Sequence, residues 1–362
     1  MEPALGIFSG SHTYFAHMKT TNLGLLGFGN VNRTLVELLQ RKDAELRERH
    51  GIEWRITGVA SRRIGWQVNA AGFDAADLLR ARSSDAFASD AFARMRGEEC
   101  NYYNAWLDAA QPDVVFEATS LNVEAGQPAI DHIRAALEHG AHAITANKGP
   151  VVHAYEELRE LAARRGKQFL FESTVMDGIP IFSLFRDTLP AIEVNGFKGI
   201  LNSTTNVILT GMEQGLSFDE SLGQAQQLGV AETDASHDID GWDAAVKVAA
   251  LVNVIMGVRL PPQKVEREGI RGLTGEAVRS ARNAGSPYKL ICRAQRTDSG
   301  VSASVRPEQI PLTDAMALVG GTSSIIQFET DIFPGLTITE ENPGLYATAY
   351  GMLADFIRAV GS

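Results

Sequence analysis

The chain is poor in cysteine and has no excess of positive charge. Its 362 residues include only Cys100 and Cys292, which excludes a disulfide framework and a cysteine-based metal site and favours a reducing compartment such as the cytoplasm. Lysine and arginine number 33 against 44 acidic residues, so the formal net charge is −11. Nucleic acids and anionic membranes are therefore not expected as partners.

The chain also lacks long apolar runs, internal repeats and low-complexity linkers. No run reaches the about 20 residues that a membrane-spanning helix needs. Residues 1–17 have neither the basic start nor the apolar core of a signal peptide, and we expect residues 1–20 to be a disordered extension. The composition is 44% hydrophobic and 21% charged, which is typical of a globular protein with room for two domains.

A dinucleotide-binding turn is predicted near the N-terminus. Residues 23–39 have the pattern of a short apolar strand, a glycine turn and an amphipathic helix. Gly27 would form the tight turn, and Gly29 would let the backbone approach a pyrophosphate at the positive end of the helix. Asn32 stands where a third glycine is usual, so helix and strand should pack less closely there. The alternative is a strand–helix turn that needs glycine for its shape alone.

The next predicted strand, residues 54–60, ends in Ser61, Arg62 and Arg63. In a dinucleotide fold an acid at this place binds the free ribose 2′-hydroxyl, whereas arginine accommodates a 2′-phosphate. Arg62 therefore favours NADP(H) as the cofactor, with NAD(H) as a second option. The competing interpretation is a pair of solvated loop arginines.

Strands and helices then alternate, which predicts a parallel sheet with helices on both faces. Residues 146–150 close one predicted strand at its carboxyl end, the edge at which open α/β sheets bind ligands, so Lys148 is a candidate site residue. The predicted strands are 114–118, 142–145 and 168–172, and the predicted helices are two pieces within 73–100, then 102–110, 128–139 and 155–165.

The second half of the chain has a different pattern. Ser217 and Glu220 form a capping-box pattern for a helix that ends at Gly229. Further predicted elements are a helix at 181–189 and strands at 193–201, 288–296, 302–307 and 323–330, which indicate a mixed or antiparallel sheet.

These patterns predict an α/β protein with two domains. A Rossmann-type dinucleotide-binding domain is expected at residues 21–171, followed by an α+β substrate-binding and dimerisation domain with a mixed sheet at 172–342. The apolar face of a helix within 343–362 needs a core to cover, and we expect it to pack back on the first domain. Apolar residues 251–256 suggest a surface for a partner subunit, so a homodimer is expected.

Residues 229–247 carry the densest group of charges, five carboxylates and one lysine. Asp243 and Lys247 are four residues apart in a predicted helix, so their side chains share one face. The plainer alternative is a surface ion pair behind an acidic loop. Reduction of an aldehyde requires a proton for the developing alkoxide, which a buried lysine can supply. Whether Lys247 or Lys148 passes that proton stays open, with Lys247 favoured.

Four separated motifs resemble those of homoserine dehydrogenases, in the same order and over the chain from about Asn22 onward. They are residues 27–31, 145–148, 199–206 and 229–247. The resemblance implies NAD(P)-dependent interconversion of L-homoserine and L-aspartate 4-semialdehyde in the biosynthesis of threonine, methionine and isoleucine. It also implies a short, monofunctional form, because no sequence is left after Ile357 for a regulatory domain.

The resemblance carries over residue roles. It implies that Glu232 and Asp238 hold the substrate's amino group, with donors for its carboxylate near Thr204. The implied catalytic residues are Lys247, Asp243 and Lys148. The implied cofactor-binding residues are Gly27, Phe28, Gly29, Asn30, Val31, Arg62, Thr119, Lys148 and Gly344. Main-chain oxygens of Glu172, Val175, Asp177 and Ile179 would hold a sodium ion.

The sequence departs from the family pattern at Asn32, at Ala235 and in residues 342–344, and Asp177 replaces a small residue in the ion-binding segment. Two other functions therefore stay in view. One is a dehydrogenase of another small amino acid or semialdehyde, and the other is a sensor that binds NADP(H) without turnover. The retained charges at Asp238, Asp243 and Lys247 argue against the sensor, because buried charges are costly to keep without a use.

Overall fold

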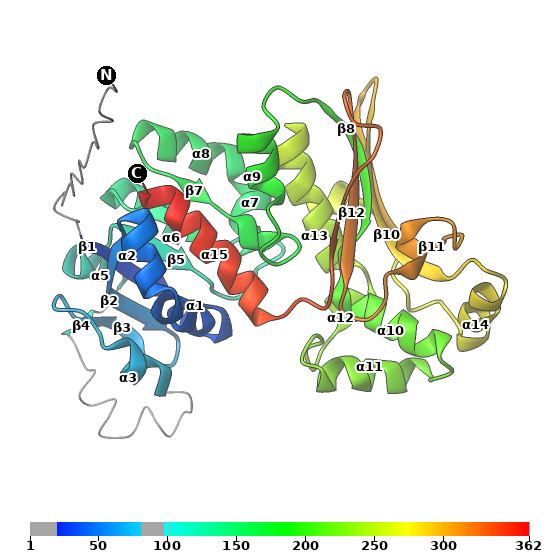
Figure 1. Ribbon diagram of the computed structural model, residues 1–362, viewed down its shortest axis with the longest axis horizontal. Coiled ribbons are helices and arrows are strands. Elements are labelled where there is room, and N and C mark those ends of the chain that lie inside the picture. Colours follow the sequence, from blue (N-terminus) through cyan, green and yellow to red (C-terminus); the bar gives the residue numbers. More distant parts are fainter. Residues whose placement is uncertain (1–19, 81–97, 101, 362) are drawn as a thin grey trace, which may run out of the picture.

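The computed structural model describes residues 20–80, 98–100 and 102–361, so the extension expected at residues 1–20 lies outside the described residues except for Thr20. The described chain forms two β-sheets, each with its own helices (Figure 1). In the part of the chain that the structure describes, no helix is long and apolar enough to cross a membrane.

The first sheet has seven strands in the order β4-β3-β2-β1-β5-β6-β7. Strands β1, β2, β5, β6 and β7 are parallel, as predicted, whereas β3 and β4 run antiparallel at one edge. The prediction of a wholly parallel sheet was wrong there, because Arg62–Ile64 is too short a link between β2 and β3 for a crossover helix. The strands are β1 Thr20–Leu26, β2 Glu53–Ser61, β3 Gly65–Val68, β4 Glu98–Cys100, β5 Val114–Glu117, β6 His142–Thr145 and β7 Phe169–Leu170.

Seven helices accompany this sheet in the described residues. They are α1 Asn30–Arg41, α2 Asp43–His50, α3 Ala75–Arg80, α5 Tyr103–Ala110, α6 Ala129–His139, α7 Lys148–His153 and α8 Tyr155–Arg164. Of the two helical pieces expected within 73–100, α3 is present, residues 98–100 form strand β4, and residues 81–97 lie outside the described residues. The strand expected at 168–172 is shortened to β7, because Glu172–Thr174 turns into a 3-10 helix.

The second sheet has six strands in the order β13-β12-β8-β10-β11-β9. Its pairs are antiparallel except for β9 with β11, so the predicted mixed sheet is confirmed, although β9 and β13 were not predicted. The strands are β8 Val194–Ile200, β9 Glu266–Arg267, β10 Tyr288–Thr297, β11 Gly300–Gln309, β12 Ser324–Thr330 and β13 Leu336–Glu340.

Two helices of the second half begin at the predicted residues, Ile181 and Phe218, whereas the next predicted helix begins at Ser203, within the segment that was expected to precede it. Ser217 and Glu220 form the predicted capping box, in which each side chain accepts a hydrogen bond from the other's backbone N–H. The helix expected over 181–189 is a short α-helix continued by a wider π-helical turn, Leu184–Thr188. The helices are α9 Ile181–Ser183, α10 Ser203–Glu213, α11 Phe218–Gln227, α12 Ser236–Ile239, α13 Trp242–Leu251 and α14 Gly275–Asn283.

Helix α13 is buried between the second sheet, where it contacts β10 and β11, and helix α7 of the first half. It is continued by a π-helical turn at Val252–Met256, which forms part of the apolar segment assigned to a partner surface. Most of that segment is buried within this chain, and only Val254 and Ile255 are partly exposed.

The last helix, α15 Leu345–Val360, returns to the first sheet and packs along α1 (Figure 1). Its Phe356 ring meets the Phe116 ring of β5 edge-on, with the centroids 5.7 Å apart. Ala349, Met352 and Leu353 join the same apolar core. The first sheet therefore completes its core with residues from the far end of the chain.

Asp355 of α15 gives a pH dependence of stability. Its side chain is 3% exposed and accepts a hydrogen bond of 2.8 Å from the Glu172 N–H, and burial raises the pKa of Asp355 to about 7. The folded state therefore binds a proton that the unfolded chain releases near pH 4, so the free energy of unfolding should fall as the pH rises from about 4 to 7. We expect Asp355→Asn, which keeps the acceptor oxygen, to remove up to ~4 kcal/mol of that fall.

Urea unfolding of the parent and the variant at pH 4, 5.5, 7 and 8 measures this difference. The buried Glu340 carboxyl, whose pKa burial also raises to about 7, contributes equally to both proteins. Parallel pH profiles would contradict the assignment to Asp355.

Candidate active site

The glycine turn lies between β1 and α1. Gly27 has φ +82°, and a β-carbon there would come within 2.5 Å of the backbone carbon and oxygen of Ala118, so only glycine fits. A β-carbon on Gly29, in contrast, would meet nothing within 4 Å. Asn30 and Val31 begin α1, whose first N–H groups face this open space without a side-chain cap. An anion such as a pyrophosphate fits here.

Asn32, at the place of the usual third glycine, binds the backbone of the turn, and the looser packing of helix on strand expected there stays a prediction. Its side chain is fully buried, and its Nδ2 donates hydrogen bonds of 3.1 Å to the carbonyls of Leu26 and Gly27. The amide thus ties the first turn of α1 to the end of β1, and it replaces close glycine packing by hydrogen bonds. Phe28 is also buried, with the Arg33 guanidinium 4.6 Å from its ring centroid.

Arg62 follows directly after β2, the strand beside β1. It is exposed, and its guanidinium lies 3.5 Å from Ser120 Oγ in the loop after β5. Thr119 in the same loop is held by Glu117, which accepts hydrogen bonds from its N–H at 2.8 Å and from its hydroxyl. These residues line the same edge of the sheet as the glycine turn, because β1, β2 and β5 are parallel.

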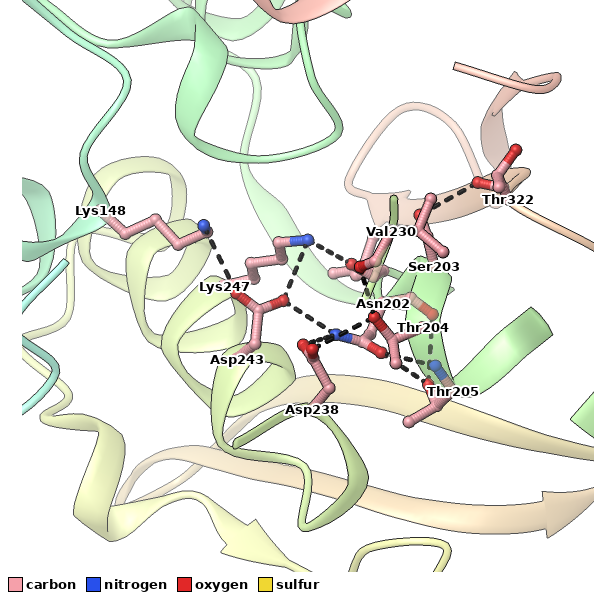
Figure 2. A network of polar contacts seen from close by, with 11 residues as sticks. Lys148, Asn202, Ser203, Thr204, Thr205, Val230, Asp238, Asp243, Lys247 and Thr322 are labelled. Carbon is pink, nitrogen blue, oxygen red and sulfur yellow. Dashed lines mark hydrogen bonds and ion pairs between the residues drawn. The ribbon is translucent and has the colours of Figure 1, made fainter. Parts of the chain in front are cut away.

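Asp243 is the centre of a charged cluster between the two halves of the chain (Figure 2). Lys247, one turn further along α13, has its Nζ 3.2 Å from Asp243 Oδ2, and Lys148, the first residue of α7, has its Nζ 3.4 Å from Oδ1. The three side chains are only 16–21% exposed. Lys247 also donates a hydrogen bond of 2.6 Å to the Leu201 carbonyl. The predicted pair Asp243–Lys247 is therefore present, and Lys148 joins it from helix α7, which follows the seven-stranded sheet's strand β6.

A second carboxylate, Asp238, is joined to Asp243 by Asn202. The Asn202 Nδ2 group donates to Asp238 Oδ1 at 2.7 Å and to Asp243 Oδ2 at 3.1 Å, as Figure 2 shows. The Thr204 hydroxyl lies within hydrogen-bond distance of Asp238 Oδ2, at 3.1 Å, and of the Val230 carbonyl, at 2.8 Å, and its single proton serves one of them at a time. Asn202 caps α10, and its Oδ1 accepts from the Thr205 N–H. The capping residue of one helix thus orients both carboxylates.

The charges of the cluster fix its protonation. Burial alone would raise the pKa of Asp243, but Lys247 and Lys148 outweigh it and hold that pKa well below the usual value. Burial would lower the pKa of Lys247, yet Asp243 and Asp177 raise it above its usual value. Burial and the charge of Asp243 raise the pKa of Asp238. Asp243 therefore stays ionised and Lys247 stays protonated, whereas Asp238 takes up a proton more readily.

Other predicted site residues lie apart from this cluster. Glu232 is exposed, and in the described contacts its backbone carbonyl accepts a hydrogen bond from Gln226. Gly344 is exposed at the start of α15. Tyr346, two residues later, donates to Glu37 of α1 at 2.8 Å, which brings this end of α15 beside α1.

The four residues predicted to bind sodium lie on the segment that links the two sheets. Met176 and Asp177 both have φ near +50°, a strained conformation for residues with a side chain. The Glu172 carboxylate accepts from the backbone N–H groups of Phe182 and Ser183, and the Ile179 carbonyl accepts from Ile181 N–H at 2.8 Å. At least one of the four carbonyls is therefore already engaged, and the sodium site stays a prediction.

Sequence reasoning missed two residues of these networks. Asn202 is contained in the motif at 199–206, but nothing in the sequence says that its amide spans two carboxylates 36 and 41 residues away. Glu117 did leave a signal, since it is a charged residue in a strand whose four residues are all buried. A charged residue at the carboxyl end of a parallel strand is a candidate for a site role.

The open glycine turn and the lysine–carboxylate cluster, on two domains of these folds, define a NAD(P)-dependent oxidoreductase. Residues 27–172 match the family model described as "Homoserine dehydrogenase, NAD binding domain", and residues 180–357 match the model "Homoserine dehydrogenase". The chain belongs to the homoserine dehydrogenase family.

Individual relatives agree with the family models. The chain is 34% identical to a NAD(+)-dependent homoserine dehydrogenase of Pseudomonas canavaninivorans, over 94% of this chain and 96% of the relative. A crystal structure of a putative homoserine dehydrogenase from Archaeoglobus fulgidus superposes with a TM-score of 0.82 at 30% identity, over 94% of this chain and all of that one. A hyperthermophilic archaeal homoserine dehydrogenase mutant in complex with NADPH gives 0.76 at 27%, over 94% and 98%.

The two glycines of the turn give a matched pair of variants. Gly27→Ala should lower the melting temperature, because its β-carbon would collide with the Ala118 backbone at a positive φ. Gly29→Ala should melt like the parent but bind NADPH at least about tenfold more weakly, because the β-carbon would fill the space open to the pyrophosphate.

Fluorescence titration with NADPH and thermal melts provide both readouts. Gly223→Ala on α11, whose β-carbon also meets nothing within 4 Å, serves as the control. Unchanged NADPH affinity in Gly29→Ala would show that the cofactor does not approach this turn.

Proposed function

We propose that the chain interconverts L-homoserine and L-aspartate 4-semialdehyde with NAD(P)(H). The observation that carries this proposal is the Lys148–Asp243–Lys247 cluster, which joins the two domains of a member of the homoserine dehydrogenase family. Lys148 belongs to the domain with the glycine turn, whereas Asp243 and Lys247 belong to the second domain. Cofactor and substrate held by separate domains would therefore meet at these side chains.

The nicotinamide cofactor, when bound, supplies or accepts the hydride. Lys247 is suited to stabilise the developing alkoxide and to donate the proton, because Asp243 keeps it charged and the Leu201 carbonyl orients its ammonium. We favour Lys247 as the proton donor and place Lys148 on the same proton path, since both ammonium groups contact one carboxylate. Asp243 then acts as the fixed negative charge between them.

Substrate recognition is proposed to combine Asp238, Glu232 and the start of α10. Asp238 would bind the α-ammonium group, and Glu232 would reach it only after the loop carrying it moves inward, since its side chain is exposed. The α-carboxylate would bind near Thr204 at the positive end of α10. The Thr205 N–H is not available for it, because it donates to Asn202.

We propose NADP(H) as the preferred cofactor, with NAD(H) as the alternative. Arg62 supports this preference by its charge and exposure at the end of β2. One relative is NAD(+)-dependent and another forms a complex with NADPH, so both cofactors occur among the relatives. No catalytic step is assigned to a sodium ion.

The domain boundaries, oligomeric state, location and pathway of the enzyme are also proposed. We propose domain boundaries near residues 21–171 and 172–342 with residues 343–362 on the first domain, and a homodimer in the cytoplasm that serves threonine and methionine biosynthesis. The dimer is supported by a groove whose lining includes the apolar side chains of Val254, Ile255, Phe185 and Leu189 beside Arg186.

Lys247→Ala tests the proposed chemistry. We expect the parent to oxidise L-homoserine, and we expect kcat of the variant to fall by roughly 10²- to 10⁴-fold, the range for loss of a general acid or base. Initial rates followed by absorbance of the reduced cofactor, with Lys148→Ala in parallel, would show which lysine carries the larger share.

Lys198→Ala is the matched control, because Lys198 forms an ion pair of 2.6 Å with Asp314 outside the cluster. A folded parent that binds NADPH but oxidises only other amino-acid alcohols would move the assignment to another substrate. Binding without any turnover would indicate a sensor.

Arg62→Ala tests the cofactor preference. Loss of a charged hydrogen bond to the 2′-phosphate should lower kcat/KM for NADP by roughly 10- to 100-fold and leave the value for NAD nearly unchanged. The exposed Arg49→Ala on α2, which removes only a surface ion pair with Glu45, is the control. Equal losses with both cofactors would show that Arg62 does not read the 2′-phosphate.

A further inference from the structure

Glu117 is a fully buried carboxylate that the proposed mechanism does not use. It ends β5 and pairs with Leu26 of β1 and with Thr145 of β6. Each of these partners stands just before a functional loop, the glycine turn after Leu26 and the segment leading to Lys148 after Thr145. Among the described residues, Glu117 forms hydrogen bonds with neutral donors and no ion pair, so its burial is costly.

The carboxylate of Glu117 joins two loops. Its Oε1 accepts from the backbone N–H of Thr119 at 2.8 Å and from the Thr119 hydroxyl, and its Oε2 accepts from the Thr145 hydroxyl at 2.6 Å. The loop after β5 also lies beside the glycine turn, because a β-carbon added at Gly27 would come within 2.7 Å of the backbone of Ala118 and Thr119. Glu117 thus connects the turn proposed to bind the cofactor with the end of β6.

From Thr145 the chain of hydrogen bonds continues to helix α7. The Thr145 Oγ1 accepts from the Asn147 N–H at 2.9 Å, and Asn147 Oδ1 caps α7 by accepting from Gly149 N–H at 2.9 Å. The Asn147 side chain also donates to the Thr119 carbonyl at 3.3 Å, which closes a ring of contacts. Lys148, the first residue of α7, lies in sequence between the capping residue Asn147 and Gly149, whose N–H the cap binds.

The direction of these hydrogen bonds requires an acceptor at residue 117. The single hydroxyl proton of Thr145 goes to Glu117, and this leaves an oxygen lone pair for the Asn147 N–H. An amide in place of the carboxylate would offer either its oxygen or its N–H₂ group to Thr145, and the other to Thr119. The hydroxyl that faces the N–H₂ group would then have no acceptor for its own proton.

We propose that Glu117 is a positioning residue of this dehydrogenase, which fixes the Lys148 ammonium relative to the glycine turn and to Asp243. The inference rests on the proposed function and adds the group that aligns the two halves of the site. Lys148 reaches Asp243 at 3.4 Å, so a displacement of about 1 Å at the start of α7 would break this contact. Misplacement of that size can lower rates by about 10²-fold.

Glu117→Gln is the central variant, and Thr145→Val, which removes the hydroxyl between Glu117 and Asn147, is a second one. We expect each to lower kcat for L-homoserine at least tenfold with a smaller change in KM. In the double variant Glu117→Gln/Lys148→Ala, the rate should be no lower than in Lys148→Ala alone, because both changes act through one lysine. Asp355→Asn, another buried carboxylate, is the control that should keep the parental kcat.

Rate losses that multiply in the double variant would overturn the proposal, because Glu117 would then act independently of Lys148. A crystal structure of Glu117→Gln, or of Thr145→Val if the former does not fold, gives a test that needs no turnover. We expect the Lys148–Asp243 separation to exceed 4 Å, and an unchanged separation would refute the positioning role. An inactive parent would count against the proposed function alone, since the structural comparison would still decide the role of Glu117.

Discussion

The buried charge of Asp243 is the constraint on which the site depends. A carboxylate with so little exposure is stable only beside compensating charge, and here the compensation comes from two lysines on different domains. Lys247 is supplied by the same helix, whereas Lys148 is supplied by the helix after β6. The electrostatic need of one side chain therefore holds together two parts of the chain that are separated by about a hundred residues of sequence. Removal of either cation would leave part of that charge uncompensated.

The remainder of the site follows from the edge of a parallel sheet. Strands β1, β5 and β6 end side by side, and each passes directly into a segment that carries proposed site residues: the glycine turn, the Thr119 loop and the start of α7. Glu117 and Asn147 connect these segments through hydrogen bonds of fixed direction. The second domain contributes Asn202, which plays the same part for Asp238 and Asp243. In each domain, buried polar side chains thus connect the segments that carry the charged residues.

Local patterns predicted most of the regular elements and one charged pair, Asp243 with Lys247, and tertiary contacts account for what they missed. The capping box at Ser217 and the pairing of Asp243 with Lys247 depend on residues within four positions of one another, so local sequence is enough to predict them. The antiparallel edge strands β3 and β4 are short, and their pairing depends on a tight link, not on apolar periodicity. The hydrogen bonds of Asn32 to Leu26 and Gly27 were not predicted, because a pattern of residue types does not show where an amide points. Asn202 was missed since its partners are distant in sequence.

The docking of α15 on the first sheet has a consequence for the order of folding. Ala349, Met352, Leu353 and Phe356 complete a core whose other members lie before residue 171. During synthesis the first domain must therefore wait, with part of its apolar surface open to water, until the whole second domain has emerged from the ribosome. The strands of the six-stranded sheet, in contrast, all lie within residues 194–340 and have been made in full before α15 emerges. The first sheet is thus the last to complete its core, although all of its strands are made first.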